Sequence, residues 1–373
     1  MVFCVKNNFN SISNLNQEKS TDMKNQKSIR SILALAGSSL LLASVHPSFA
    51  GVADPSGIVN VSVPATNTVI SATPFARPIE AFGTVSSVAS SSGNTTLTVA
   101  VNSGSRSLPS FTNTDPNVDS WYVVEILDGP AIGLILKAVG GTSSSIVASG
   151  TLPASVNIAT GSKFAVRKDW TLTSLFGAAS SSNAFGSGTA PTSTGVNAQV
   201  QLYNVDTGSL TTYYISSAGG YNWRSSGSTV NRNHAPVGLG TGFSIVNRKG
   251  VVFNFPLSGE YRTARTRLVV PAGKKTLLGN PGVYDITFAD STITETSPNR
   301  ATTVPNTSHD LYQVWNAPTR SFLSYRIGGT STTASAYVGS TRTNPVIGKF
   351  TALLASPAGA NPSVVTIAPA LTQ

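Results

Sequence analysis

The stretch "LYNVDTGSLTTYYI", residues 202–215, has the outline of a strand, a tight turn and a second strand. The same outline returns as "VWNAPTRSFLSYRI" at residues 314–327, which is an ungapped offset of 112 residues. Both copies keep an asparagine before the turn, a threonine within it, and a Tyr-x-Ile pattern in the second strand. Because alternate strand residues face the same side of a sheet, that pattern predicts a packed face. We interpret the hairpin as a structural unit that the fold reuses, in preference to a binding site displayed twice.

The turns of the two hairpins differ in sequence. The first ends on Gly208, a residue type that adopts positive φ without strain, whereas the second has Arg320 at the matching position. We therefore expect the turn to change between the copies while the strands persist. A weaker match closes each unit, as "TGFSI" at 241–245 and "GKFTAL" at 348–353. A repeating β-unit of irregular length accounts for these matches.

Elsewhere the chain also reads as strands and turns. Short runs rich in Val, Ile, Thr and Tyr alternate with clusters of Gly, Asn, Asp and Pro. The stretch "WYVVEILDGPAIGLILKAV" at 121–139 predicts a hairpin, and "VVFNF" at 251–255 is expected to pair with "TRLVV" at 266–270. We predict an all-β fold in which repeated hairpin units form β-sandwich or barrel-like blocks.

Two stretches rich in Ser, Thr and Pro interrupt the strands and are typical of linkers or long surface loops. The division that they predict is an N-terminal β domain at 51–177, a linker at 178–197, a second β block at 198–295, a linker at 296–308 and a third β block at 309–373. The third block repeats the start of the second.

The N-terminal region predicts export. Three basic residues follow Met23, and they precede an apolar run at 32–45 that ends on the small-x-small tripeptide Ser48-Phe49-Ala50. The basic residues are Lys24, Lys27 and Arg30. The run is too short for a stable membrane span, so residues 1–50 are interpreted as an N-terminal extension and signal peptide that starts at Met23 and is cleaved after Ala50. An uncleaved anchor is the less favoured alternative. We expect a secreted or cell-surface protein.

The composition of residues 51–373 limits the chemistry and the partners expected for this part of the chain. The only cysteine, Cys4, precedes this part, so disulfides and thiol chemistry are not expected within it. It carries 20 Lys and Arg against 13 Asp and Glu, a net charge of +7 that favours anionic partners. Nucleic acid is not expected as a partner, because an exported protein is separated from cellular nucleic acid and the sequence contains no nucleic-acid-binding motif. No apolar run after the signal is long enough for a transmembrane helix.

No set of residues identifies a reaction. His234 and His309 lie in turn-rich sequence, and the metalloprotease, hydrolase and phosphate-loop motifs are absent from the sequence. Glycoside hydrolysis needs two carboxylates that the fold brings together, and sequence spacing nominates no such pair. We nominate no catalytic residue and favour a non-enzymatic protein, with the enzyme alternative left open.

One stretch has part of a calcium-loop pattern. Asp115, Asn117 and Asp119 have the D-x-N-x-D spacing that places oxygen ligands around one ion. Ser120 stands where the loop needs glycine, and Glu125 is one residue short of the usual bidentate glutamate. Because the same residues also suit an ordinary turn, we favour the turn, and apart from this calcium alternative no cofactor is expected.

Two further groups are candidate binding residues. The densest basic cluster predicts a patch for an anionic glycan or lipid head group, although an edge strand protected by charge is the favoured alternative. Its members are Arg262, Arg265, Arg267, Lys274 and Lys275. Three tryptophans predict stacking on sugar rings if they are exposed, although the hydrophobic core is the favoured place for each. They are Trp121, Trp223 and Trp315.

The order of several motifs resembles a family of exported bacterial proteins of unknown function. The motifs are "YVVEILDGPAIGLILKAV", "FAVRKDWTLTSLFG" and "AQVQLYNVDTGSLTTYYI", the last followed by Trp223. Members of that family carry a signal peptide, a YxVEIxxG hairpin, a WTLxxLF segment and repeated LYNxxTGxYxxYYY hairpins. The third block departs from it, since it lacks a counterpart of Trp223 and has Arg326 in place of a tyrosine. The resemblance covers residues 51–373 and implies export and β-structure, and it supplies no catalytic residues.

These observations favour an exported, non-enzymatic, β-rich structural or binding protein of the cell surface or extracellular matrix. Self-assembly through unpaired strand edges would suit such a protein. Its expected partners are other copies of itself, other surface proteins and anionic glycans. The alternative is a carbohydrate-binding or polysaccharide-active protein, and an outer-membrane β-barrel is a weaker one.

Overall fold

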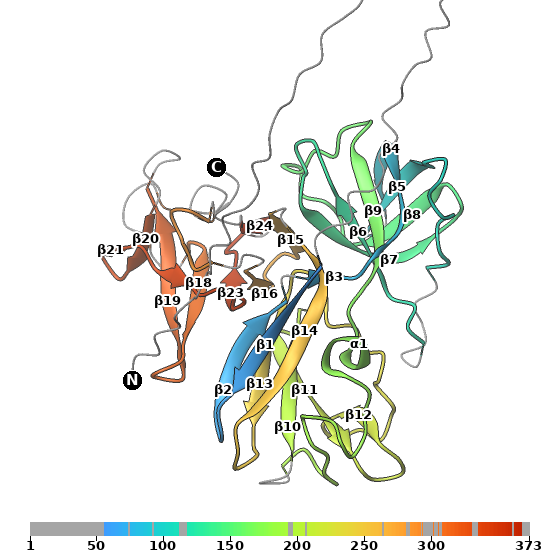
Figure 1. The fold of residues 1–373 in the computed structure, drawn as a ribbon. Coiled ribbons are helices and arrows are strands. Elements are labelled where there is room, and N and C mark those ends of the chain that lie inside the picture. Colours follow the sequence, from blue (N-terminus) through green and yellow to red (C-terminus); the bar gives the residue numbers. More distant parts are fainter. Residues whose placement is uncertain are drawn as a thin grey trace, which may run out of the picture. The chain divides into compact units, whose positions relative to one another are not determined.

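The computed structural model describes residues 56–367, apart from residues 74, 92, 112–117, 193–196, 206, 263–264, 281–283, 292, 294–300, 302–304, 306–307, 330–334 and 360–361. The predicted signal peptide, residues 1–50, lies outside the described residues. Val52–Gln373 forms one compact unit. Strands make up nearly all of the regular secondary structure in its described part, which confirms the all-β prediction (Figure 1). Among the described residues, no helix has the length and apolar character required to cross a membrane.

Six strands between residues 79 and 168 close into a barrel. They are β4 (Ile79–Ser91), β5 (Asn94–Val101), β6 (Tyr122–Ile126), β7 (Leu134–Gly141), β8 (Ser145–Ser149) and β9 (Lys163–Lys168). Their order is β7-β6-β9-β4-β5-β8, and a second pairing of β8 with β7 closes the ring. The predicted hairpin at 121–139 is confirmed as β6 and β7. Tyr122, Val124 and Ile126 belong to the barrel core, whereas Val123 belongs to the neighbouring core, as the alternation of a strand requires.

Two later strands extend the barrel sheet at β7. β15 (Thr266–Val270) runs parallel to the start of β7, and β24 (Ser363–Ile367) pairs antiparallel with β15. The expected pairing of 251–255 with 266–270 is wrong, because β14 (Phe253–Tyr261) pairs with β1 and β3 instead. β14 and β15 thus belong to different sheets and do not form a hairpin.

Two sheets form a β-sandwich with a shared apolar core. The first has the order β1-β14-β3, and the second β12-β11-β10-β13-β2. Their bounds are β1 (Ser56–Val63), β2 (Thr68–Ala72), β3 (Phe75–Ala76), β10 (Ala198–Asn204), β11 (Ser209–Ser216), β12 (Asn222–Ser225) and β13 (Gly242–Asn247). Phe255 of β14 and Val200 of β10 belong to the same buried cluster. Strand pairing here joins the predicted first and second blocks, because β1 and β2 pair with β14 and β13.

One short helix in the described part of the chain, α1 (Leu172–Phe176), covers this core. Thr171 caps it, accepting from the Ser174 backbone N–H at 3.3 Å. Phe176 packs edge-on against Phe185 with ring centres 5.4 Å apart. Phe185 comes from the predicted linker at 178–197 and is fully buried, so its ring anchors that stretch to the core. The burial of Phe185 could not be predicted, because a single phenylalanine among small polar residues gives no periodic pattern.

A further sheet contains the second copy of the repeated hairpin. Its order is β16-β23-β18-β19-β20-β21. The bounds are β16 (Thr276–Gly279), β18 (Leu311–Asn316), β19 (Ser321–Gly328), β20 (Ser335–Val338), β21 (Thr341–Thr343) and β23 (Ala352–Ser356), and β17 (Ile286–Thr287) pairs separately with β22 (Val346–Ile347). Ile70, Leu277 and Ala352 form a small apolar cluster that joins this sheet to the sandwich.

The two copies of the hairpin, β10–β11 and β18–β19, share their register and their turn contacts. In each, the asparagine that ends the first strand pairs with the serine that begins the second. The asparagine Oδ1 accepts from the threonine amide N–H, at 3.2 Å in the first copy and 3.3 Å in the second. The threonine and serine hydroxyls lie 2.8 and 2.9 Å apart. The residues are Asn204, Thr207 and Ser209 in one copy, and Asn316, Thr319 and Ser321 in the other. The retained polar residues therefore close the turn.

The expected change is absent from the backbone at the position where arginine replaces glycine. Gly208 has φ of 69°, and Arg320 at the matching position has φ of 53°. Arg320 thus adopts the left-handed conformation in which a side chain costs about 1–2 kcal/mol. The shared hydrogen bonds and strand register hold the second turn in this conformation despite the missing glycine.

Candidate functional site

Four charged side chains cluster where the outer wall of the barrel meets β14. The carboxylate of Glu125 on β6 accepts at Oε1 from Arg262 Nη2 at 2.7 Å and Nε at 3.1 Å. Arg167 on β9 places its Nε 3.3 Å from Glu125 Oε2 and donates from Nη1 to Glu260 Oε2 at 2.5 Å. The side chains of Glu125, Arg167 and Arg262 are at most 3% exposed, and that of Glu260 is 18% exposed. Two carboxylates thus balance two guanidinium groups, as buried charges require.

Arg262 does not belong to an exposed patch for an anionic partner, contrary to the prediction. Its guanidinium is enclosed by Glu125 and also donates to Thr266 Oγ1 at 3.0 Å, so it has no surface for a partner in solution. Burial raises the pKa of Glu125, but the guanidinium groups of Arg262 and Arg167 outweigh it and leave the pKa below its ordinary value. The ion pair joins residues 137 positions apart, a separation at which sequence spacing indicates no contact.

A second buried carboxylate, Asp169, lies at the end of β9 in a different environment. Its Oδ1 accepts the backbone N–H groups of Trp170 and Leu239, each at 2.8 Å. Burial raises the pKa of Asp169 to about 6, against the opposing effect of these two hydrogen bonds. The side chain fixes the segment that leads into β13, and sequence reasoning did not nominate it.

The calcium candidate is only partly described. Asp115 and Asn117 lie outside the described residues. Asp119 is engaged by cations, because Arg77 Nη1 donates to its two oxygens at 2.9 and 3.0 Å and Lys168 Nζ lies 3.6 Å away. These contacts place positive charge where a calcium ion would have to bind. The described residues contain no group of three or more His, Cys, Asp and Glu side chains that could hold a metal ion.

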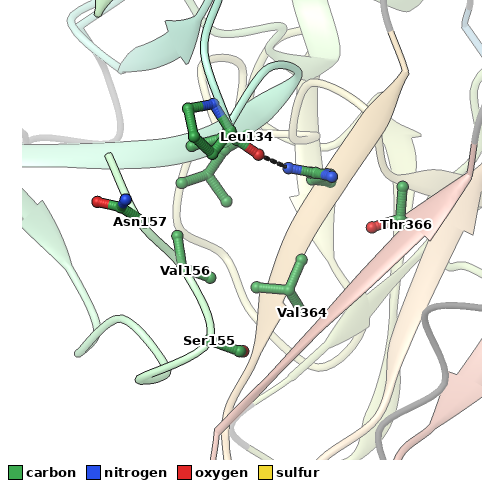
Figure 2. Close-up of a pocket in the computed structure, with 9 residues that line it drawn as sticks. Leu134, Ser155, Val156, Asn157, Val364 and Thr366 are labelled. Carbon is green, nitrogen blue, oxygen red and sulfur yellow. Dashed lines mark hydrogen bonds between the residues drawn. The ribbon is translucent and has the colours of Figure 1, made fainter. Parts of the chain in front are cut away.

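Another arginine of the basic cluster, Arg267, lies beside a cavity. Arg267 lines an open cavity of about 230 Å³ between the barrel and β15–β24 (Figure 2). The other lining residues include Pro130, Ala131 and Leu134 from the barrel, Ser155 and Val156 from a loop, and Val364 and Thr366 from β24. Arg267 donates from Nη1 to the Pro130 carbonyl at 2.5 Å. Burial and the nearby charge of Arg265 lower the pKa of Arg267. Lys274 is half-buried and Lys275 is exposed, and neither lines the cavity.

Trp223 lies in the sandwich core. Its side chain is 0% exposed, and its ring centre is 5.5 Å from that of Phe185. Its indole Nε1 donates to the Gly177 carbonyl at 3.1 Å. A ring enclosed in this way has no free face for a sugar, so the burial agrees with the hydrophobic-core alternative.

The other two tryptophans are half-buried. Trp315 packs edge-on against Phe322 at 5.2 Å, and both join Tyr203 beside the small cluster between the sandwich and the last sheet. Tyr203 and Trp315 occupy matching positions of the two hairpins, so the repeat brings equivalent aromatic residues together. The Lys137 ammonium group lies 4.8 Å from the centre of the Trp121 ring in a cation–π contact. Sugar stacking at Trp121 and Trp315 stays a prediction.

The edge of β1 is a feature that sequence reasoning missed. Within the described residues β1 pairs with β14 alone, and it is the longest of the strands that end a sheet there. Its sequence, "SGIVNVSV", has neither a charge nor a proline, and Ile58 is 70% exposed. In an antiparallel pair, half of the backbone N–H and C=O groups point away from the partner strand. The edge status of a strand depends on the topology, so composition alone did not indicate it.

No protein-family model, curated protein or solved structure matches this chain. The resemblance to a family of exported bacterial proteins therefore rests only on the YxVEIxxG, WTLxxLF and hairpin motifs. In the structure, the glutamate of the first motif is Glu125 of the buried ion pairs, and the hairpin motif forms β10–β11.

Proposed function

We propose that this chain is an exported, non-enzymatic, β-rich protein of the cell surface or extracellular matrix that self-associates through the β1 edge. The observation that carries the proposal is the unprotected edge of this strand. Natural sheets commonly block such an edge with lysine, proline or a bulge, because unpaired backbone groups are a template for another strand. The eight residues of β1 carry no charge and no proline.

The partner that fits this edge best is a second copy of β1. Two identical uncharged strands meet antiparallel about a two-fold axis without opposing like charges, and such an interface closes on itself. The join would extend the β1-β14-β3 sheet into the second copy by backbone hydrogen bonds. Ile58 alternates with Asn60 and Ser62 on the exposed face of the strand, next to the join.

The environments of the buried charged groups support a non-enzymatic protein. Glu125 and Glu260 are held by arginines, and Asp169 accepts from two backbone N–H groups. These contacts give each carboxylate a structural role. Export is supported by the basic, apolar and small-residue pattern that ends at Ala50 and by the resemblance to exported proteins.

The self-association is tested on residues 51–373 with Ile58→Lys. The substituted side chain is 70% exposed, so the fold should persist while the charge opposes edge-to-edge pairing. Sedimentation velocity over a range of concentrations is expected to show association of the wild-type chain and its loss in the variant. Val251→Lys, at a residue 60% exposed outside β1, is the matched control and should associate normally. A wild-type chain that stays monomeric throughout, or equal losses in both variants, would contradict the proposal.

The export part of the proposal has a separate test. When the full chain is produced in a bacterium, N-terminal sequencing of the exported protein should begin at Gly51. Substituting Ala50 with a bulky residue should retain the precursor, because signal cleavage needs small residues at that point. An unprocessed chain that stays inside the cell would contradict this part and leave the β1 measurement unaffected.

A further inference from the structure

The cavity beside Arg267 combines one cation with small apolar and hydroxyl-bearing side chains. Figure 2 shows Ser155 and Val156 on one side of it and Val364 and Thr366 on the other. The walls come from the barrel, from its 155–157 loop and from the β15–β24 extension, segments that only the folded chain brings together. Its volume of about 230 Å³ admits one small group and not a stretch of polymer.

The guanidinium of Arg267 is fixed and incompletely used. The bond from Nη1 to Pro130 sets its orientation, while the buried Nε–H has no hydrogen-bond partner among the described residues. Because the Nε atom is buried, a ligand in the cavity meets the guanidinium through its positive charge and its other N–H groups. Arg265 adds a second positive charge nearby. In the part of the chain that the structure describes, neither arginine forms an ion pair with a carboxylate.

We propose that this cavity binds the carboxylate of an acidic sugar, the charged unit of an anionic polysaccharide. The planar guanidinium of an arginine presents N–H donors in a geometry that suits a carboxylate. Val156 and Val364 offer apolar contact to the C–H face of a sugar ring, while Ser155 and Thr366 carry hydroxyls for its polar edge. Phosphate fits less well, because its higher charge calls for more donors than one partly used guanidinium supplies. Binding here does not require association through β1, so either proposal can fail alone.

The test titrates residues 51–373 with D-glucuronate at low ionic strength, followed by NMR chemical shifts or calorimetry. D-Glucose serves as the neutral counterpart and inorganic phosphate as the competing anion. We expect saturable binding of glucuronate at one site, no saturation with glucose, and weaker binding of phosphate. Arg267→Gln should lower the affinity for glucuronate at least about tenfold, and Arg265→Gln by a smaller factor, because only Arg267 lines the cavity.

Two further variants separate the cavity from general charge effects. Ser155→Trp places a bulky group at an exposed lining residue without changing charge, and it should also reduce glucuronate binding. Lys275→Gln removes an exposed charge away from the lining and should leave the affinity unchanged. A cooperative thermal unfolding transition in each variant would show that all of them are folded. Undiminished binding in Arg267→Gln, equal binding of glucose, or tighter binding of phosphate would each overturn the proposal.

Discussion

Arg262 directly follows β14 of the sandwich and Arg267 lies in β15 of the barrel sheet, close together in the sequence, yet their surroundings are opposite. Arg262 faces the outer side of β6, where Glu125 takes two of its N–H groups. Arg267 lies beside the start of β7, where the barrel offers only the Pro130 carbonyl and a cavity. The comparison shows that the role of an arginine depends on what the neighbouring sheet presents to it. One is part of the packing, and the other is available to a ligand.

The largest expected effect comes from removing the carboxylate that distinguishes the two sites. Glu125→Gln leaves Arg262 buried without its carboxylate partner and leaves Arg167 with Glu260 alone, so the free energy of unfolding should fall by about 3–5 kcal/mol. Urea denaturation at neutral pH measures this. The control is Glu80→Gln, which breaks a more exposed pair with Arg106 at 3.3 Å and should cost less than about 1 kcal/mol. Similar small losses in both variants would show that the buried cluster does not stabilise the fold as described.

The two buried carboxylates should give stability opposite dependences on pH. Because the folded pKa of Glu125 is lowered from 4.5, its contribution is present above that value and is lost as the pH falls through the folded pKa. Asp169 has a folded pKa of about 6, raised from 3.8, so it favours the folded state at low pH. Its contribution is lost as the pH rises from about 4 to about 6, by up to about 3 kcal/mol.

The variant that isolates this second effect is Asp169→Asn, which keeps an oxygen acceptor and removes the charge. Denaturation curves from pH 4 to pH 7 should show a flatter profile than the wild-type chain, with the difference largest above pH 6. Glu125 is unchanged in this variant, so the loss of stability at lower pH should remain. An identical profile in both proteins would mean that Asp169 does not titrate in this range.

Substituting Arg267 at the cavity is expected to lower the free energy of unfolding less than the same substitution at the buried Arg262. Arg267→Gln loses one hydrogen bond to a carbonyl, which is worth about 1 kcal/mol or less. The same change at Arg262 leaves Glu125 with only Arg167 and should cost about 3 kcal/mol. Thermal and urea denaturation of the two variants side by side would check the ranking. A reversed order would break the distinction between a packed and an available arginine.

Arg320 lies outside both regions and provides the smallest expected effect. Because it has φ of 53° in the turn of the second hairpin, Arg320→Gly should raise the free energy of unfolding by about 0.5–1 kcal/mol. Gly208→Ala, at the matching turn with φ of 69°, should lower it by about 1 kcal/mol. Both are measured by thermal denaturation, and glucuronate binding should be unchanged in each. A loss of stability in Arg320→Gly would mean that the arginine side chain stabilises this turn.

Local patterns were enough to predict the strands and the repeat. The hairpin predicted at 121–139 is β6 and β7, and the matched hairpins proved to share register and turn contacts. The prediction failed at Arg320, because the absence of glycine was taken to exclude a conformation that the surrounding hydrogen bonds impose. It also failed at 251–255 and 266–270, where two neighbouring strands belong to different sheets.

The candidate site was predictable only in its residue types. A basic segment that contains Arg265 and Arg267 is visible in the sequence, but so is Arg262, which the fold encloses. Likewise the sequence does not distinguish the three tryptophans, whereas in the structure Trp223 is fully buried and Trp121 and Trp315 are half-buried. Neither the cavity nor the β1 edge corresponds to a local pattern, since both depend on which strands become neighbours.

The sequence by itself determined the all-β class and the repeated hairpin, because strand periodicity and turn chemistry act over a few adjacent residues. Only the tertiary structure decided which arginine meets a carboxylate, which strand ends a sheet and where a cavity opens. The physical reason is that these properties depend on contacts between distant residues, as the 137 positions between Glu125 and Arg262 illustrate.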